Sequence, residues 1–229
     1  MGDKNLNELL KWSIENSVPS DDGTKEANPQ TNLTPELIAA LMGGPSDADL
    51  MKASMEAIVS TDPEITLSSK ITAFDNLEQL IESLDNANLL SKLGLWTPLL
   101  ECLAHDESEL RIMAAWCVGT AVQNNEPCQE RLVALGGVER LVRMAIGERL
   151  PKADGVATEG EEQKDVRRKA VYALSSAVRN YQPAMDVCVS ELRKKGDELV
   201  SGEEKKIDAT DMEAVDVIIN GLKERAKSA

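Results

Sequence analysis

Residues 109–127, ELRIMAAWCVGTAVQNNEP, recur as DVRRKAVYALSSAVRNYQP at residues 165–183, an offset of 56. Six of the nineteen aligned positions are identical, and Trp116 of the first copy aligns with Tyr172 of the second. The identical pairs are Arg111 with Arg167, Ala114 with Ala170, Ala121 with Ala177, Val122 with Val178, Asn124 with Asn180, and Pro127 with Pro183. This agreement is far above chance, so the chain contains an internal repeat.

The period of the repeat points to a class of fold. Residues 149–162 are rich in Pro, Gly and acidic residues and look like an insertion of 14 residues, and removing them from the offset leaves 42. Gly94 and Gly136, in similar helix–loop–helix contexts, are also 42 residues apart. Armadillo and HEAT repeats have periods in this range. Such units cannot bury their apolar faces alone and stack on their neighbours. We therefore expect an all-α, armadillo-like helical repeat solenoid.

Helical spacing of apolar residues extends this prediction along the chain, with two shorter helices and one longer helix in each unit. Long helices are predicted at about residues 68–84, 108–124 and 164–181, and shorter ones around 89–103 and 128–147. A last helix from Asp211 is predicted to cap the final exposed apolar face.

Near the N-terminus, two short helices are expected at residues 6–14 and 34–41, on either side of a polar, aperiodic stretch. The predicted division is a flexible N-terminal segment with two short helices (1–45), an armadillo-like repeat domain (46–200) and a C-terminal capping helix region (201–229).

Composition and charge restrict the possible partners. Aromatic residues make up only 3% of the chain, so the core must consist mainly of aliphatic residues, Met and Ala. A net charge of −15 repels phosphate backbones and anionic lipids, which argues against nucleic acid and membrane surfaces as partners. The longest low-polarity run, residues 114–122, is far shorter than the roughly 18 to 20 residues that a membrane span needs. A soluble, cytoplasmic protein is expected.

No reaction centre is visible in the sequence. The four cysteines have no CxxC spacing and lie among apolar residues, and the single histidine, His105, has no second histidine for a metal pair. Nucleotide-binding, nucleophile-elbow and HExxH motifs are missing. We therefore expect no cofactor, no metal and no enzymatic activity. A helical stack of this kind usually offers its concave face to another macromolecule.

Five strings of the sequence resemble a known family. They are LNELLKWSIENS, DADLMKASMEAI, ITAFDNLEQLIESLDNANLLSKLGLWTPLL, ELRIMAAWCVGTAVQNN and VRRKAVYALSSAVRNYQPAM. They resemble the fungal Fes-type nucleotide exchange factors of the seventy-kilodalton heat-shock chaperones (heat shock protein 70), relatives of the animal Hsp-binding proteins. The resemblance spans nearly the whole chain.

The resemblance implies an armadillo-type domain that grips the nucleotide-binding domain of the chaperone and loosens its hold on ADP. It also implies that the N-terminal segment engages the substrate side of the chaperone and helps to free bound polypeptide. Four groups of contact residues are expected on this basis. They are Asp85, Asn86, Ala87 and Asn88 in a turn after the first long helix, Asn124 and Asn180 at the ends of the next two, Arg111, Arg167 and Arg179 for acidic groups of the chaperone, and Tyr181 as an apolar anchor.

Other interpretations stay open at this stage. An Asn at a helix end often caps it, and an Arg in a repeat often braces the neighbouring unit. The alternative for the N-terminal helices is that they pack on the repeat stack. The main alternative function is an armadillo-type adaptor that binds basic peptides, which the acidic charge favours slightly, and a helical hydrolase is the third. A monomer is expected, because both ends of the stack look capped.

Overall fold

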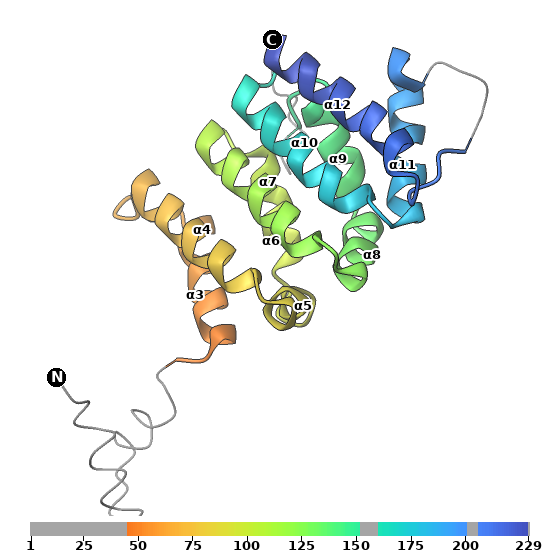
Figure 1. Ribbon diagram of the computed structural model, residues 1–229. Coiled ribbons are helices and arrows are strands. Elements are labelled where there is room, and N and C mark those ends of the chain that lie inside the picture. Colours follow the sequence, from red (N-terminus) through yellow and green to blue (C-terminus); the bar gives the residue numbers. More distant parts are fainter. Residues whose placement is uncertain (1–44, 152–159, 201–205, 229) are drawn as a thin grey trace, which may run out of the picture. The chain divides into compact units, whose positions relative to one another are not determined.

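The computed structural model describes residues 45–151, 160–200 and 206–228, and within these ranges the chain is helical apart from one isolated bridge between Glu148 and Glu161 (Figure 1). A compact unit begins at Asp47. The short helices predicted at residues 6–14 and 34–41 lie outside the described residues. The predicted all-α class is confirmed for the described part of the chain.

The long helices form one layer of the compact unit. They are α4 (Leu67–Ile81), α7 (Ser108–Val122) and α10 (Lys164–Val178), each 15 residues long, and α12 (Met212–Ser228). Each packs against the next, so that α4, α7, α10 and α12 follow one another in order (Figure 1). The three predicted long helices are confirmed, although each ends two or three residues earlier than predicted.

The shorter helices pack behind this layer. They are α3 (Asp47–Val59), α5 (Leu84–Lys92), α6 (Trp96–Glu101), α8 (Glu126–Ala134), α9 (Gly137–Ala145) and α11 (Gln182–Lys194), with 3-10 turns at Cys102–Ala104 and Glu198–Val200. Gly136, with φ of +69°, separates α8 from α9, and Gly94, with φ of +71°, stands at the matching point between α5 and α6. This order of one long and two shorter helices fits an armadillo-like repeat.

The core lies between the two layers and is aliphatic. α7 is buried on most of its circumference, because it lies between α4 and α10 and also packs against α6 and α8. Small side chains let the long helices come close. A Cβ atom at Gly119 would lie 2.5 Å from Cε1 of Tyr172 and 3.1 Å from Cα of Ala173. The glycine is therefore required by the contact between α7 and α10.

The predicted turn at residues 85–88 is wrong, because these residues form the first turn of α5. Asn86 is buried, and its Nδ2 donates to the carbonyl oxygen of Leu80 at 3.0 Å and to Oδ2 of Asp47 at 2.8 Å. This amide therefore joins α3, α4 and α5. Ala87 is only 1% exposed.

The C-terminal helix packs as predicted. Val215, Ile218, Ile219 and Leu222 of α12 are buried, and α12 packs against α10. No helix of the described residues is long and apolar enough to cross a membrane.

Candidate functional site

A groove runs across the layer of long helices where α4, the start of α5, α7 and α10 meet. It has a volume of about 570 Å³. Its lining residues are Glu78, Ile81, Glu82, Leu84, Ala87, Trp116, Thr120, Gln123, Asn124 and Tyr172. We call it the Trp116 groove. Two of the predicted contact residues, Ala87 and Asn124, meet in it, although Ala87 offers almost no exposed surface.

Two aromatic rings, Trp116 and Tyr172, form the wall on the α7–α10 side, and the ammonium group of Lys169 lies against them. The Nζ atom of Lys169 lies 4.0 Å from the centre of the Trp116 ring and 5.4 Å from that of Tyr172. An ammonium at this distance is attracted by the negative face of the ring. Burial lowers the pKa of Lys169, while the nearby carboxylate of Glu78 opposes that change. The stack therefore holds a partly desolvated cation at a defined place.

The α4 side of the groove carries carboxylates. Glu78 is buried, and its Oε1 accepts a hydrogen bond from Oγ1 of Thr120 at 2.7 Å. Glu82, at the end of α4, is exposed. The groove therefore combines aromatic faces with two carboxylates, a set of groups suited to non-covalent binding of a protein surface.

The two repeat asparagines have a backbone role. Asn124 and Asn180 follow α7 and α10 with φ of +51° and +57°, a region that few residues other than Gly, Asn and Asp adopt readily. Both side chains are exposed. Asn124 lines the Trp116 groove, whereas Asn180 donates its backbone N–H to the carbonyl oxygen of Ala209 at 2.9 Å and is not in the groove.

The next two predicted residues lie between α10 and α11, with Arg179 directly after α10 and Tyr181 directly before α11. Tyr181 is half-buried, and burial, with help from Glu130 and Glu126, raises the pKa of its hydroxyl. Arg179 donates to Oδ1 of Asp216 on α12 at 2.5 Å. It is only partly buried, so it connects α10 to α12 and still reaches solvent.

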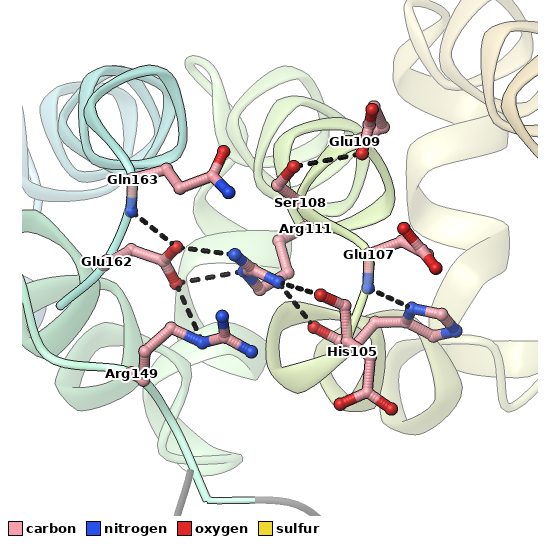
Figure 2. A network of polar contacts seen from close by, with 9 residues as sticks. His105, Glu107, Ser108, Glu109, Arg111, Arg149, Glu162 and Gln163 are labelled. Carbon is pink, nitrogen blue, oxygen red and sulfur yellow. Dashed lines mark hydrogen bonds and ion pairs between the residues drawn. The ribbon is translucent and has the colours of Figure 1, made fainter. Parts of the chain in front are cut away.

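Arg111 is not available to a partner, contrary to the prediction. It is fully buried, and its guanidinium donates to both carboxylate oxygens of Glu162, at 3.0 and 2.7 Å (Figure 2). Its Nη1 donates to the carbonyl oxygens of His105 and Asp106, each at 2.7 Å. Since every one of these partners belongs to the chain itself, Arg111 anchors the C-terminal end of the insertion that was predicted at residues 149–162.

Arg167, the repeat equivalent of Arg111, is also turned inward. It is 8% exposed, its Nε donates to the carbonyl oxygen of Ala145 at 3.3 Å, and its guanidinium lies close to Gly147. The bracing role that the sequence left open for these arginines is therefore the correct one for both.

Asp85 and Asn88 lie on α5 near the groove. Asp85 is exposed, and Asn88 is half-buried, with its Oδ1 3.7 Å from the thiol of Cys128. Trp116, Tyr172, Lys169 and Glu78 are not among the contact residues predicted from the sequence. The match of Trp116 with Tyr172 between repeat copies was a signal that could have found two of them, because equivalent positions share a face.

The described residues hold no group of three or more His, Cys, Asp or Glu side chains arranged for a metal ion. All four cysteines are buried and free. Burial raises the pKa of Cys102 and of Cys128 to about 11 and that of Cys188 to about 12. These thiols are therefore protonated at neutral pH, and the thiolate is the reactive form.

Comparison with known proteins gives a consistent result. The family model described as nucleotide exchange factor Fes1 matches residues 6–90. A protein of Gibberella zeae named Hsp70 nucleotide exchange factor FES1 is 59% identical over 230 residues, covering 100% of both chains. A protein of Neurospora crassa named Hsp70 nucleotide exchange factor fes-1 is 49% identical over 257 residues, covering 99% of this chain and 100% of that one.

A solved engineered protein is similar with a TM-score of 0.48 at 20% identity, covering 84% of this chain and 71% of that one. The sequence relatives decide the assignment, because their similarity extends over the whole chain at an identity well above 30%. The chain belongs to the family of the nucleotide exchange factor Fes1.

Proposed function

We propose that this protein is a nucleotide exchange factor of heat shock protein 70 (Hsp70) that binds the chaperone's nucleotide-binding domain and promotes release of ADP and then of bound polypeptide. The observation that carries the proposal is the 59% identity, over the full length of both chains, to a relative named as such a factor. The groove supports it, since aromatic faces and charged groups on one side of a rigid stack suit protein recognition.

The mechanism needs no reactive group. A factor that binds more tightly to the chaperone conformer that holds ADP poorly shifts the population toward that conformer. A ~100-fold faster release corresponds to about 2.7 kcal/mol if all of the preference appears in the release barrier. We infer that the protein acts in this way, by binding alone and not as an enzyme. Where the coupling is one of equilibrium affinities it is reciprocal, so saturating ADP weakens the binding of this protein to the chaperone.

Contact with the chaperone is proposed for the Trp116 groove and its surroundings. Leu84 lines the groove and is 56% exposed, so its apolar side chain is accessible to a partner, and Asn124 also lies in the lining. Asp85, Asn88, Arg179, Asn180 and Tyr181 keep exposed atoms and remain candidates for the same interface. The N-terminal segment, residues 1–45, is proposed to engage the substrate side of the chaperone, and the complex is proposed to form in the cytoplasm.

Stopped-flow release of a fluorescent ADP analogue from a cytosolic Hsp70 tests the function and the groove together. The chain provides a matched pair of variants, Leu84→Glu and Val59→Glu, because both residues are exposed and both changes add one negative charge. Val59, 47% exposed, is the last residue of α3 in the other layer. We expect acceleration by the wild type and by Val59→Glu, and at least a ~10-fold loss for Leu84→Glu, as for removal of an apolar contact within an interface.

Each other outcome has a distinct meaning. Equal acceleration by all three proteins would remove the groove from the interface and leave the function intact. No acceleration by the wild type with several cytosolic Hsp70 proteins would refute the exchange function.

The basic-peptide adaptor remains the second candidate because Glu78 and Glu82 place two carboxylates in the groove. However, the ammonium of Lys169 already occupies the face of Trp116, on which a peptide cation would stack. A labelled basic peptide is therefore expected not to bind at low salt, and saturable binding would favour the adaptor.

A further inference from the structure

A second hollow of about 500 Å³ adjoins the Trp116 groove, where α7, α10 and α12 meet. Ile112, Asp165, Arg168, Lys169, Lys223 and Lys227 line it, and Tyr172 lines both hollows and so forms the wall between them. We call this second site the basic hollow. Its lining carries four cationic side chains and one carboxylate, in a chain whose net charge is −15.

The cations of the basic hollow are available to an external group. Arg168 pairs with Asp165 at 3.3 Å, and Lys227 pairs with Glu224 at 2.7 Å. The four side chains of these two ion pairs are each more than 60% exposed, and each pair lies within one helix. Exposed ion pairs of this kind contribute little to stability, so a carboxylate from another molecule can replace the partner of Arg168 or Lys227 at small cost. Lys223 is exposed. Lys169 lies near the carboxylate of Glu78, which opposes the lowering of its pKa by burial.

Lys169 gives the hollow a fixed point. Its ammonium is held over two aromatic rings and is partly buried, so it loses less side-chain freedom on binding than a freely rotating lysine would. Across the Tyr172 wall, the Trp116 groove contains two glutamates and no Lys or Arg in its lining. The two neighbouring hollows therefore have opposite charge.

We propose that the basic hollow docks a cluster of carboxylates on the surface of the chaperone, and that its contrast with the acidic side of the Trp116 groove allows the partner to bind in only one orientation. The proposal rests on the proposed function and names the chemistry of its partner surface. Reversing the partner would place its carboxylates against Glu78 and Glu82, and such like-charge contacts at an interface are strongly unfavourable. The chain as a whole is negatively charged and repels an acidic surface, so the basic hollow also guides the approach of the chaperone during association.

The test compares Lys223→Glu with Lys52→Glu in the full-length chain. Lys52 is exposed on α3, in the other layer, and its change alters the net charge by the same amount. Lys223→Arg is the conservative variant. Association with Hsp70 is followed by stopped-flow fluorescence at ionic strengths from about 0.03 to 0.5 M, a range over which the screening length falls severalfold. Circular dichroism checks that each variant is folded.

We expect Lys223→Glu to weaken binding on the order of tenfold at low salt, mainly through a slower association rate. The difference from the wild type should shrink as salt rises, while Lys52→Glu and Lys223→Arg should behave like the wild type. If Lys223→Glu binds as tightly as Lys52→Glu at low salt, the inference is overturned and the proposed function stands. If the wild type does not bind Hsp70, both fall.

Discussion

At the scale of single residues, one repeat position shows how burial decides a role. Arg111 and Arg167 occupy equivalent positions at the start of α7 and α10. Both turn inward to the loop that precedes their helix or the neighbouring unit, Arg111 to Glu162 and two carbonyls and Arg167 to the carbonyl of Ala145. Both copies of the repeat therefore have an arginine that binds neighbouring parts of the chain, but the atoms that accept its hydrogen bonds differ between the copies.

The first prediction concerns the buried pair of Arg111 and Glu162. Arg111→Met leaves the buried carboxylate of Glu162 with the backbone N–H of Gln163 at 2.9 Å and the guanidinium of Arg149 at 3.9 Å, and it removes the donors for two carbonyls. We expect a loss of about 3–5 kcal/mol in the free energy of unfolding. Urea unfolding monitored by circular dichroism measures it.

The double variant Arg111→Met with Glu162→Met is the control for this prediction. It removes both charges together, so it should be clearly more stable than the single variant. A single variant as stable as the wild type would contradict the structural role assigned to the pair.

At the scale of elements, the contact between α7 and α10 shapes the groove. Gly119 lets α7 approach the ring of Tyr172, and the same ring forms the wall between the two hollows. The separation of two helices in the core therefore controls the shape of the surface that we propose to bind the chaperone.

The second prediction follows from this contact. Gly119→Ala places a methyl group against Tyr172 and the backbone of α10, so we expect a loss of about 1–3 kcal/mol in stability from overpacking and weaker chaperone binding, because Tyr172 is displaced. Gly94→Ala is the comparison, since its Cβ meets no atom within 4 Å and the substitution only strains a residue with φ of +71°.

Urea unfolding and Hsp70 binding of the two variants separate the effects. Gly94→Ala should lose stability, by about 1–2 kcal/mol for a left-handed residue, without a change in binding. Equal binding by Gly119→Ala and the wild type would show that Tyr172 is not part of the interface.

At the scale of the whole molecule, the compact unit is a stack in which each unit packs mainly on its neighbours. Such a stack needs terminal elements that cover the last apolar face. α12 covers the apolar face of α10. Its residues Val215, Ile218, Ile219 and Leu222 are buried, and α12 packs against α10.

The third prediction is that removal of residues 206–229 exposes this face and causes self-association. The full chain should be a monomer whose mass by light scattering does not change with concentration, and the truncated chain should show a rising mass or precipitate. A stable truncated monomer would mean that α12 is dispensable as a cap, and a full-length dimer would contradict the monomer expected from the sequence.

The long helices, their order and the family could be predicted from local sequence pattern. Helical periodicity, the glycines between short helices and the repeated RxxAxxxxxxAVxN pattern are properties of neighbouring residues, so they can be read before folding. Fold class and the three long helices followed correctly from them. The ends of α7 and α10 were predicted two or three residues too late. Asn124 and Asn180, whose backbone is left-handed, follow the two helices but belong to the same repeated sequence pattern, so the pattern does not mark where each helix stops.

Which of the predicted contact residues reach the surface depends on tertiary packing. Arg111, Arg167, Asn86 and Ala87 are buried because other helices and the end of the insertion cover them. The Trp116 groove, with Lys169 of α10 over Trp116 of α7, exists only where helices meet that lie far apart in the chain. Local pattern specifies a helix and its apolar face, whereas burial and binding surfaces depend on long-range packing between faces, which no local pattern contains.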